Sequence, residues 1–174
     1  PTILDLAPRL EQAGADALII HGRLQKEMFH GLADLEIISR VADKVRIPII
    51  ANGGIHDADS HQKALRETGA RATIIGQAAL GNPFIFKQIK SPPRETTWEE
   101  KKKVILEHAR LQITYRRDEE FAMTEMRKHL AWYIRGFKNA ARWRQKLVLV
   151  ETLPDLKQIL ENMTKEKLLE INRR

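Results

Sequence analysis

The sequence contains no cysteine, and this absence removes several kinds of chemistry from the chain. A chain without thiols forms no disulfide bond, binds no metal through thiolate and has no thiol nucleophile. The absence fits a reducing compartment. No segment approaches the roughly 18 consecutive apolar residues of a membrane span, and residues 1–5 lack the basic and apolar regions of a signal peptide. We therefore expect a cytoplasmic protein that has no membrane partner.

Acidic residues are missing from one long segment of the second half. The net charge is +7 over 174 residues. Residues 1–90 contain 11 Lys/Arg and 10 Asp/Glu, whereas residues 91–174 contain 19 and 13, so the excess belongs to the second half. Seven basic residues and no acidic residue lie between positions 126 and 150. Such a run favours an anionic partner, most simply nucleic acid, although a solvated helical face is the more common explanation of charge alone.

Helical and extended patterns alternate before residue 91. Apolar runs predict strands over 17–20, 47–51 and 72–75, and helical spacing predicts helices over 3–13, 32–41 and 57–68. Gly14 and Gly69 fit helix C-termini, and Asp57 and Asp59 are placed to cap the third helix. Continuous apolar strands separated by helices predict parallel strands that lie side by side.

The pattern becomes purely helical after Pro92-Pro93, and we place a domain boundary there, with domains over 1–91 and 92–174. Thr97 and Glu100 form a predicted capping box. The helix that they begin is predicted to carry Val104, His108, Leu111 and Tyr115 on one face. A second helix is predicted to carry Met123, Met126, Leu130, Tyr133 and Phe137 on its face. This second helix is predicted to end at Gly136. Two more helices are predicted over 140–150 and 154–171. About four helices with short connections predict an all-α helical bundle.

Three βα units are too few to close a barrel, which needs eight strands. An open sheet of three strands leaves an unpaired edge and uncovered apolar side chains. We therefore predict an α/β chain that forms a partial TIM barrel, its last three βα units, followed by the helical bundle. On this prediction an N-terminal half of the barrel lies upstream and is a possible partner, while the oligomeric state stays open.

Each predicted strand ends in a signal typical of a barrel rim. The signals are His21-Gly22-Arg23, Asn52-Gly53-Gly54 and Gly76-Gln77. Backbone N–H groups near Gly76 can approach a phosphate. Asn52 can both donate and accept, which suits the polar arm of a cofactor. His21 can contact a planar ring or a substrate, and Arg23 can bind an anion. A structural role is the more common explanation of each signal alone, but three in register favour a cofactor-binding rim.

Other residues with suggestive chemistry receive a structural interpretation. His56, Asp57, Asp59 and His61 have metal-ligand chemistry, but they fall at a helix start where aspartate caps are frequent, and we predict no metal. Aromatic residues at helical spacing are usually core, which we expect of Trp98, Trp132, Tyr133 and Trp143. The better candidates for RNA contact are the basic residues Arg127, Lys128, Arg135, Arg142 and Arg144.

Taken together, these stretches resemble the tRNA-dihydrouridine synthases. In the first half the resemblance rests on His21-Gly22-Arg23, Gly31-Leu32-Ala33-Asp34, Ile47-Pro48-Ile49-Ile50-Ala51-Asn52-Gly53 and Ile75-Gly76 through Gly81-Asn82-Pro83-Phe84-Ile85-Phe86. In the second half Met126-Arg127-Lys128-His129, Trp132-Tyr133 and Arg135-Gly136 resemble a motif of the RNA-binding helical domain in the bacterial branch. The match covers nearly the whole chain in the expected order.

The resemblance implies a flavoenzyme that reduces the C5–C6 double bond of uridines in tRNA. In that family NADPH reduces FMN, the flavin passes a hydride to the uracil ring, and a cysteine protonates the other carbon. By position, His21 would lie against the flavin, Asn52, Gly53 and Gly54 near its ribityl and phosphate arm, and Gly76 and Gln77 at the phosphate. The helical domain would hold tRNA, with Arg23 on the substrate side.

The sequence departs from the family pattern at several positions. The family usually has Asn-Gly-Asp where Gly54 stands here, and Gly-Arg where Gln77 stands, so one carboxylate and one positive charge are absent. The catalytic cysteine and a lysine near the flavin lie upstream in the family, so we expect no catalytic residue in this chain and no turnover by it alone. Two alternatives stay open: a non-catalytic, truncated or split tRNA-binding protein, and part of another FMN- or phosphate-binding TIM-barrel oxidoreductase.

Overall fold

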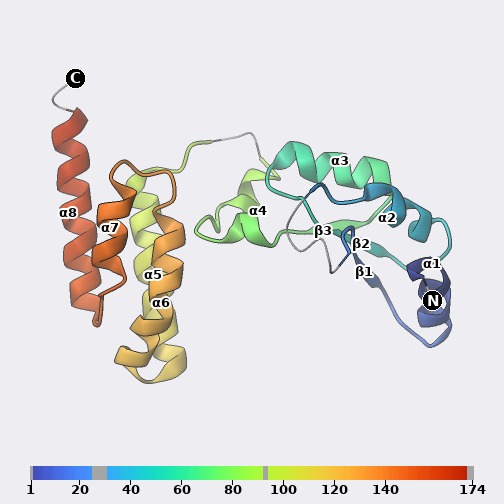
Figure 1. Cartoon of the computed structure of the whole chain (residues 1–174), viewed down its shortest axis with the longest axis horizontal. Coiled ribbons are helices and arrows are strands. Elements are labelled where there is room, and N and C mark those ends of the chain that lie inside the picture. The colour runs from blue at the N-terminus through green and yellow to red at the C-terminus, as the bar shows by residue number, and fades with distance from the viewer. Residues whose placement is uncertain (1, 25–30, 92–93, 172–174) are drawn as a thin grey trace. The chain divides into compact units, whose positions relative to one another are not determined.

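The computed structural model describes residues 2–24, 31–91 and 94–171 (Figure 1). The chain divides into two compact units. Unit 1 comprises Pro1–Ala79 and Pro83–Pro93, and unit 2 comprises Leu80–Asn82 and Arg94–Arg174. Unit 1 holds all the strands of the described residues, and unit 2 holds the four helices that follow residue 97.

Unit 1 is built on three parallel strands in the order β1-β2-β3. They are β1 (Leu18–His21), β2 (Ile49–Asn52) and β3 (Ala72–Ile74). The register pairs His21 with Asn52 and Asn52 with Ile74, so the carboxyl ends of the strands lie at the same edge of the sheet. The strands predicted over 17–20, 47–51 and 72–75 are confirmed to within two residues.

The helices of unit 1 are α1 (Ile3–Gln12), α2 (Leu35–Ala42) and α3 (Ala58–Thr68). Asp57 accepts a hydrogen bond from the Ser60 N–H at the start of α3, and Gly69 ends that helix with φ +65°, as predicted. Two short elements were not predicted, a 3-10 helix η2 (Gln77–Ala79) and α4 (Ile85–Gln88). They follow β3, where the sequence has small residues but no helical periodicity.

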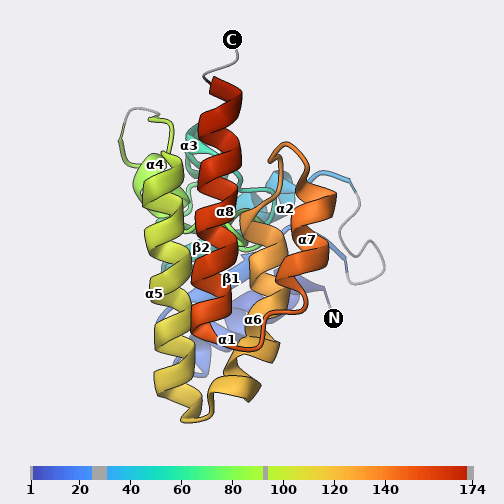
Figure 2. The same cartoon turned by 90° about the vertical axis from the view of Figure 1, so that its left-hand side faces the viewer.

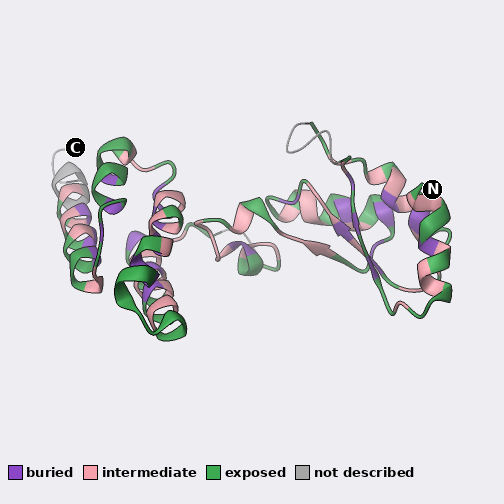
Figure 3. Ribbon diagram, turned by 60° about the horizontal axis from the view of Figure 1, so that its bottom comes forward, coloured by how far each residue is buried: buried purple, intermediate pink, exposed green. Residues whose placement is uncertain are grey.

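The core of unit 1 lies between the helices and one face of the sheet (Figure 3). Leu18, Ile20, Ile49 and Ala51 point to this face, where they pack with buried residues of α1 and α2. Ile19, which points to the opposite face of β1, is 58% exposed. A parallel sheet with helices on one face is consistent with a partial TIM barrel.

Unit 2 consists mainly of α5 (Trp98–Arg116), α6 (Glu119–Tyr133), α7 (Ala140–Leu147) and α8 (Leu153–Ile171) (Figure 2). Helix α5 packs against α6 and α8, and α7 packs against the same two helices. The predicted Thr97–Glu100 capping box is present. The buried core residues that these helices and their connections share are Trp98, Ile105, Ala109, Met123, Met126, Leu130, Tyr133, Ile134, Trp143, Leu147, Val150, Leu156, Leu160 and Met163.

The predicted apolar face of α5 is partly wrong. Leu111 and Tyr115 are 59% and 77% exposed, and the buried positions are Trp98, Ile105 and Ala109. The buried positions are offset by about one residue around the helix from the predicted ones. Because apolar residues occur at both sets of positions, their helical spacing does not show which set is buried. Of the aromatic residues expected in the core, Trp98, Tyr133 and Trp143 are buried, whereas Trp132 is only partly buried.

The second helix of unit 2 also ends earlier than predicted. Helix α6 ends at Tyr133, three residues before Gly136, so the partly buried Phe137 packs against the core from the connection that follows. Helix α7 is also shorter than the helix predicted over 140–150, because it ends at Leu147. Val150 is buried beyond its end.

Two neighbouring histidines are half-buried between α5 and α6. The ring centroids of His108 and His129 are 4.8 Å apart, and His108 Nδ1 lies 3.2 Å from the Tyr133 hydroxyl. Burial lowers the pKa of His108. Burial also lowers the pKa of His129, and the nearby positive charges of His108 and Lys128 lower it further. The folded helices therefore favour the neutral form of both imidazoles.

This cluster predicts that unit 2 loses stability in acid. Because both pKa values lie below the ordinary histidine value of about 6.5, the unfolded chain takes up protons that the folded helices resist as the pH falls through 6.5. The free energy of unfolding should decrease over that range, and less steeply in His108→Gln. All three tryptophans, Trp98, Trp132 and Trp143, lie in unit 2, so tryptophan fluorescence in urea measures this transition alone. An equal pH dependence in both proteins would contradict the prediction.

Candidate cofactor and nucleic-acid sites

A cavity of about 570 Å³ lies at the carboxyl edge of the sheet in unit 1. All six residues predicted to bind a cofactor line it, and so does Arg23. The eleven lining residues are His21, Arg23, Asn52, Gly53, Gly54, Ile55, His56, Ile74, Gly76, Gln77 and Ala78. The parallel register brings them together, because residues that follow neighbouring strands meet at one edge.

Glycine is required where the segments after β1 and β2 meet. Gly53 has φ +119°, and a Cβ there would lie 3.0 Å from the Ala33 Cβ and 3.3 Å from Cδ2 of His21. Gly22 is constrained by space alone, because a Cβ would lie 2.7 Å from the Asp34 carbonyl oxygen. The Asp34 N–H donates to the Gly22 carbonyl at 2.6 Å, and the Asp34 carboxylate caps α2. These contacts hold His21 beside Gly53.

Arg23 is oriented by a hydrogen bond and retains an unused donor. Its Nη2 donates to the Gly31 carbonyl at 3.0 Å. Its Nε is buried and has no hydrogen-bond partner among the described residues. A buried guanidinium N–H without a partner is costly unless a ligand or water accepts from it. The side chain therefore suits an anionic or carbonyl group in the cavity.

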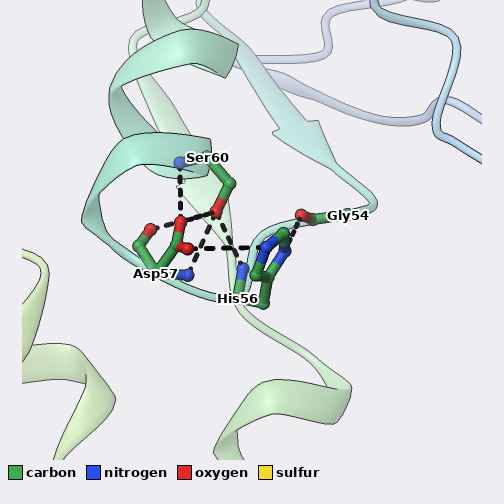
Figure 4. A network of polar contacts seen from close by, with 4 residues as sticks. All are labelled: Gly54, His56, Asp57 and Ser60. Carbon is green, nitrogen blue, oxygen red and sulfur yellow. Dashed lines mark hydrogen bonds and ion pairs between the residues drawn. The ribbon is translucent and has the colours of Figure 1, made fainter.

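His56, which enters the cavity after β2, was not predicted to belong to a binding site. A polar network joins it to Gly54, Asp57 and Ser60 at the start of α3 (Figure 4). The sequence feature that could have indicated this place for His56 is its position four residues after the end of β2. That position also marks a helix start, and the predicted cap at Asp57 explains the polar residues there without a ligand.

The electrostatic character of the cavity favours an anion. Among the residues that the structure describes around it, three have basic side chains, His21, Arg23 and His56, and none is Asp or Glu. The first N–H groups of a helix have no intrahelical partner, and η2 begins at Gln77 in this lining. A Cβ on Gly76 would meet no atom within 4 Å, so the backbone there is open to a ligand.

The basic residues predicted to contact RNA lie on α6, on α7 and between them. Lys128, Arg135, Arg142 and Arg144 are exposed. Arg142 lies 3.4 Å from the Glu166 carboxylate and also stacks over the Trp143 ring. RNA binding by these residues stays a prediction.

Arg127 differs from the other basic residues of this set. It is partly buried, and its Nε donates to the Val150 carbonyl at 3.1 Å. The hydrogen bond joins α6 to the connection between α7 and α8. Arg127 therefore has a structural role in unit 2, and the prediction that it contacts RNA stays untested.

Two other kinds of site are absent from the parts of the chain that the structure describes. No group of three or more His, Asp or Glu side chains there could hold a metal ion. His61, one of the residues with ligand chemistry, instead has its Nδ1 2.8 Å from the Thr73 hydroxyl. No helix in the described ranges is long and apolar enough to span a bilayer.

Comparison with known proteins shows which family the chain resembles along most of its length. A family model described as dihydrouridine synthase matches residues 1–169. A "probable tRNA-dihydrouridine synthase" of Mycobacterium leprae is 31% identical over 169 residues, which cover 93% of this chain and 44% of the relative. The "tRNA-dihydrouridine synthase B" of Pasteurella multocida is 37% identical over 148 residues, 82% of this chain and 44% of the relative. The chain thus spans less than half the length of these relatives.

The geometry at Gly53 predicts different outcomes for two glycine substitutions at the cavity. Gly53→Ala should destabilise unit 1 by about 1–3 kcal/mol, because the left-handed backbone and the contacts with Ala33 and His21 both oppose a methyl group. Gly76→Ala, where the same methyl group meets nothing, should leave stability nearly unchanged. Hydrogen exchange of the β1 and β2 amides measures the stability of unit 1 in both variants. Equal losses of stability would contradict the steric argument.

Proposed function

The chain belongs to the dihydrouridine synthase family, and on that premise we propose that it forms the phosphate-binding rim and the RNA-binding helices of a tRNA-dihydrouridine synthase. In this proposal unit 1 is the last three βα units of a TIM barrel, and unit 2 is an all-α helical bundle. Both come from a flavoenzyme that reduces the C5–C6 double bond of uridines in tRNA.

One observation carries the proposal. The residues that the resemblance assigns to the cofactor, which come from three separate segments of the chain, line one cavity at the carboxyl edge of the sheet. Barrel enzymes commonly bind phosphate with the loops that follow their last two strands. Asn52, Gly53 and Gly54 follow β2, and Gly76 and Gln77 follow β3, so the cavity stands where such a site would be.

The residues present fit FMN. Open backbone at Gly76 and the first N–H groups of η2 suit its phosphate, and the Asn52 amide suits the ribityl hydroxyls. His21 lies beside Gly53, where it can contact the ring system. When bound, FMN would supply hydride transfer to the uracil ring after its reduction by NADPH. The roles of this chain's residues would be to bind, to orient and to exclude water, since the chain has no cysteine to act as the acid.

The basic side chains of unit 2 support the tRNA part of the proposal. Exposed Lys128, Arg135, Arg142 and Arg144 provide a positive surface of the kind that contacts an RNA backbone. The names of the relatives refer to tRNA as well. These names also favour a dihydrouridine synthase over other FMN-binding barrels, the alternative that motifs alone left open.

The flavin site can be tested by restoring the charge that Gln77 lacks. We expect the chain to bind FMN and Gln77→Arg to bind it about tenfold more tightly, because a charge-assisted hydrogen bond to phosphate adds roughly 1.5 kcal/mol or more. Quenching of flavin fluorescence gives both affinities. Gln62→Arg, which adds the same charge on the exposed side of α3, is the matched control. If neither the chain nor Gln77→Arg binds FMN, the proposed cofactor is wrong.

The RNA surface can be tested through the salt dependence of binding. Replacing Arg135 and Arg142 with alanine should weaken tRNA binding and lower the slope of log K against log salt by about 0.7–0.9 for each phosphate that the variant no longer neutralises. Filter binding at several salt concentrations measures both quantities. A matched control replaces Arg110 and Lys63, each ion-paired on its own helix. Unchanged affinity and slope in the test variant would remove these two arginines from the interface.

A further inference from the structure

Among the described residues that line the cavity, His56 is the basic one to which the resemblance assigns no role. It follows β2 by four residues and lies with Gly76 and Gln77 in the same lining. At position 77, where the resemblance leads one to expect arginine, the chain has a neutral glutamine. His56 is therefore a basic side chain that lines the same cavity as Gln77.

The backbone and ring of His56 are both held in place (Figure 4). Its N–H donates to the Ser60 hydroxyl at 3.0 Å. Nδ1 lies 2.8 Å from the Gly54 carbonyl oxygen, which can only accept, so Nδ1 carries a proton and donates it. Neither of these two contacts involves Nε2, the second ring nitrogen.

Nε2 of His56 lies beside a carboxylate. It lies 3.5 Å from Asp57 Oδ2, which is long for a hydrogen bond but close for two charges. Asp57 Oδ1 accepts from the Ser60 N–H and hydroxyl at 2.8 and 2.6 Å. These hydrogen bonds lower the pKa of Asp57, so its carboxylate stays charged. When Nε2 carries a proton, its N–H is attracted to this negative charge.

The other two basic residues of the cavity come from the end of β1 and the segment that follows it. Arg23 is tied through Nη2 to Gly31, after β1. His21 is packed beside Gly53. The side chain of His56 is 70% exposed, which leaves its Nε2 accessible to a bound group.

We propose that His56 binds the phosphate monoester of the ligand in this cavity, with Nε2–H as the donor and with Gly54 and Asp57 orienting the ring. The inference rests on the proposed function, because FMN carries such a phosphate. It adds a binding residue from the segment after β2, and this residue compensates for the missing charge at position 77.

Riboflavin, which differs from FMN only by lacking the phosphate, provides the test. In His56→Gln the affinity for FMN should fall about tenfold while that for riboflavin stays the same, because only the phosphate loses a charged donor. Fluorescence quenching gives the ratio of the two affinities. His61→Gln is the matched control, since His61 lies on α3 outside the cavity lining and contacts Thr73 instead. An FMN-to-riboflavin ratio that is the same in wild type and His56→Gln would overturn the proposal.

Inorganic phosphate separates this inference from the proposed function. We expect the NMR signals of the His56 ring carbons to shift and saturate as phosphate is added to the wild-type chain. A chain that shows this saturation but binds neither flavin would contradict the proposed cofactor and support the role of His56. A chain that binds FMN but whose His56 signals respond to neither phosphate nor FMN would support the proposed cofactor and overturn the role of His56.

Discussion

The parallel register of the three strands is the constraint on which the cavity depends. Pairing of His21 with Asn52 and of Asn52 with Ile74 brings the three segments that follow the strands to one edge. A shift of one residue would turn each side chain of a strand to the other face of the sheet. Leu18, Ile20, Ile49 and Ala51 oppose such a shift because they would leave the core. The packing of α1 and α2 on the sheet therefore also keeps the cavity intact.

The two units use charge in different ways. In unit 1 a few basic side chains surround a cavity without carboxylates among its described lining residues, an arrangement suited to one small anion. In unit 2 the basic residues are spread over exposed helical surface, and some make structural contacts, such as the hydrogen bond from Arg127 to Val150. A dispersed positive surface suits a polyanion, which is bound through many weak contacts that depend on salt. The two arrangements are compatible with one enzyme that binds a nucleotide cofactor and an RNA.

Much of the fold was predictable because the local signals agree with one another. Apolar runs marked the strands, Asp57 and Gly69 marked the ends of α3, and the Thr97–Glu100 pair marked the start of α5. The buried face of α5 was not predictable. Two neighbouring faces of the helix carry apolar residues at the same helical spacing, and only tertiary contacts decide which of them is buried. The glycines and asparagine at the strand ends predicted residues that line the cavity. The place of His56 in the cavity lining was not predicted, because a helix cap explained its neighbours.

The central claim is that FMN occupies the cavity at the carboxyl edge of the sheet, and amide chemical shifts of the labelled chain test it most directly. Addition of FMN should shift the N–H signals of Gly53, Gly54, Gly76 and Gln77, while those of α5 to α8 stay in place. Shifts confined to the helices of unit 2, or no shifts at saturating FMN, would contradict the account.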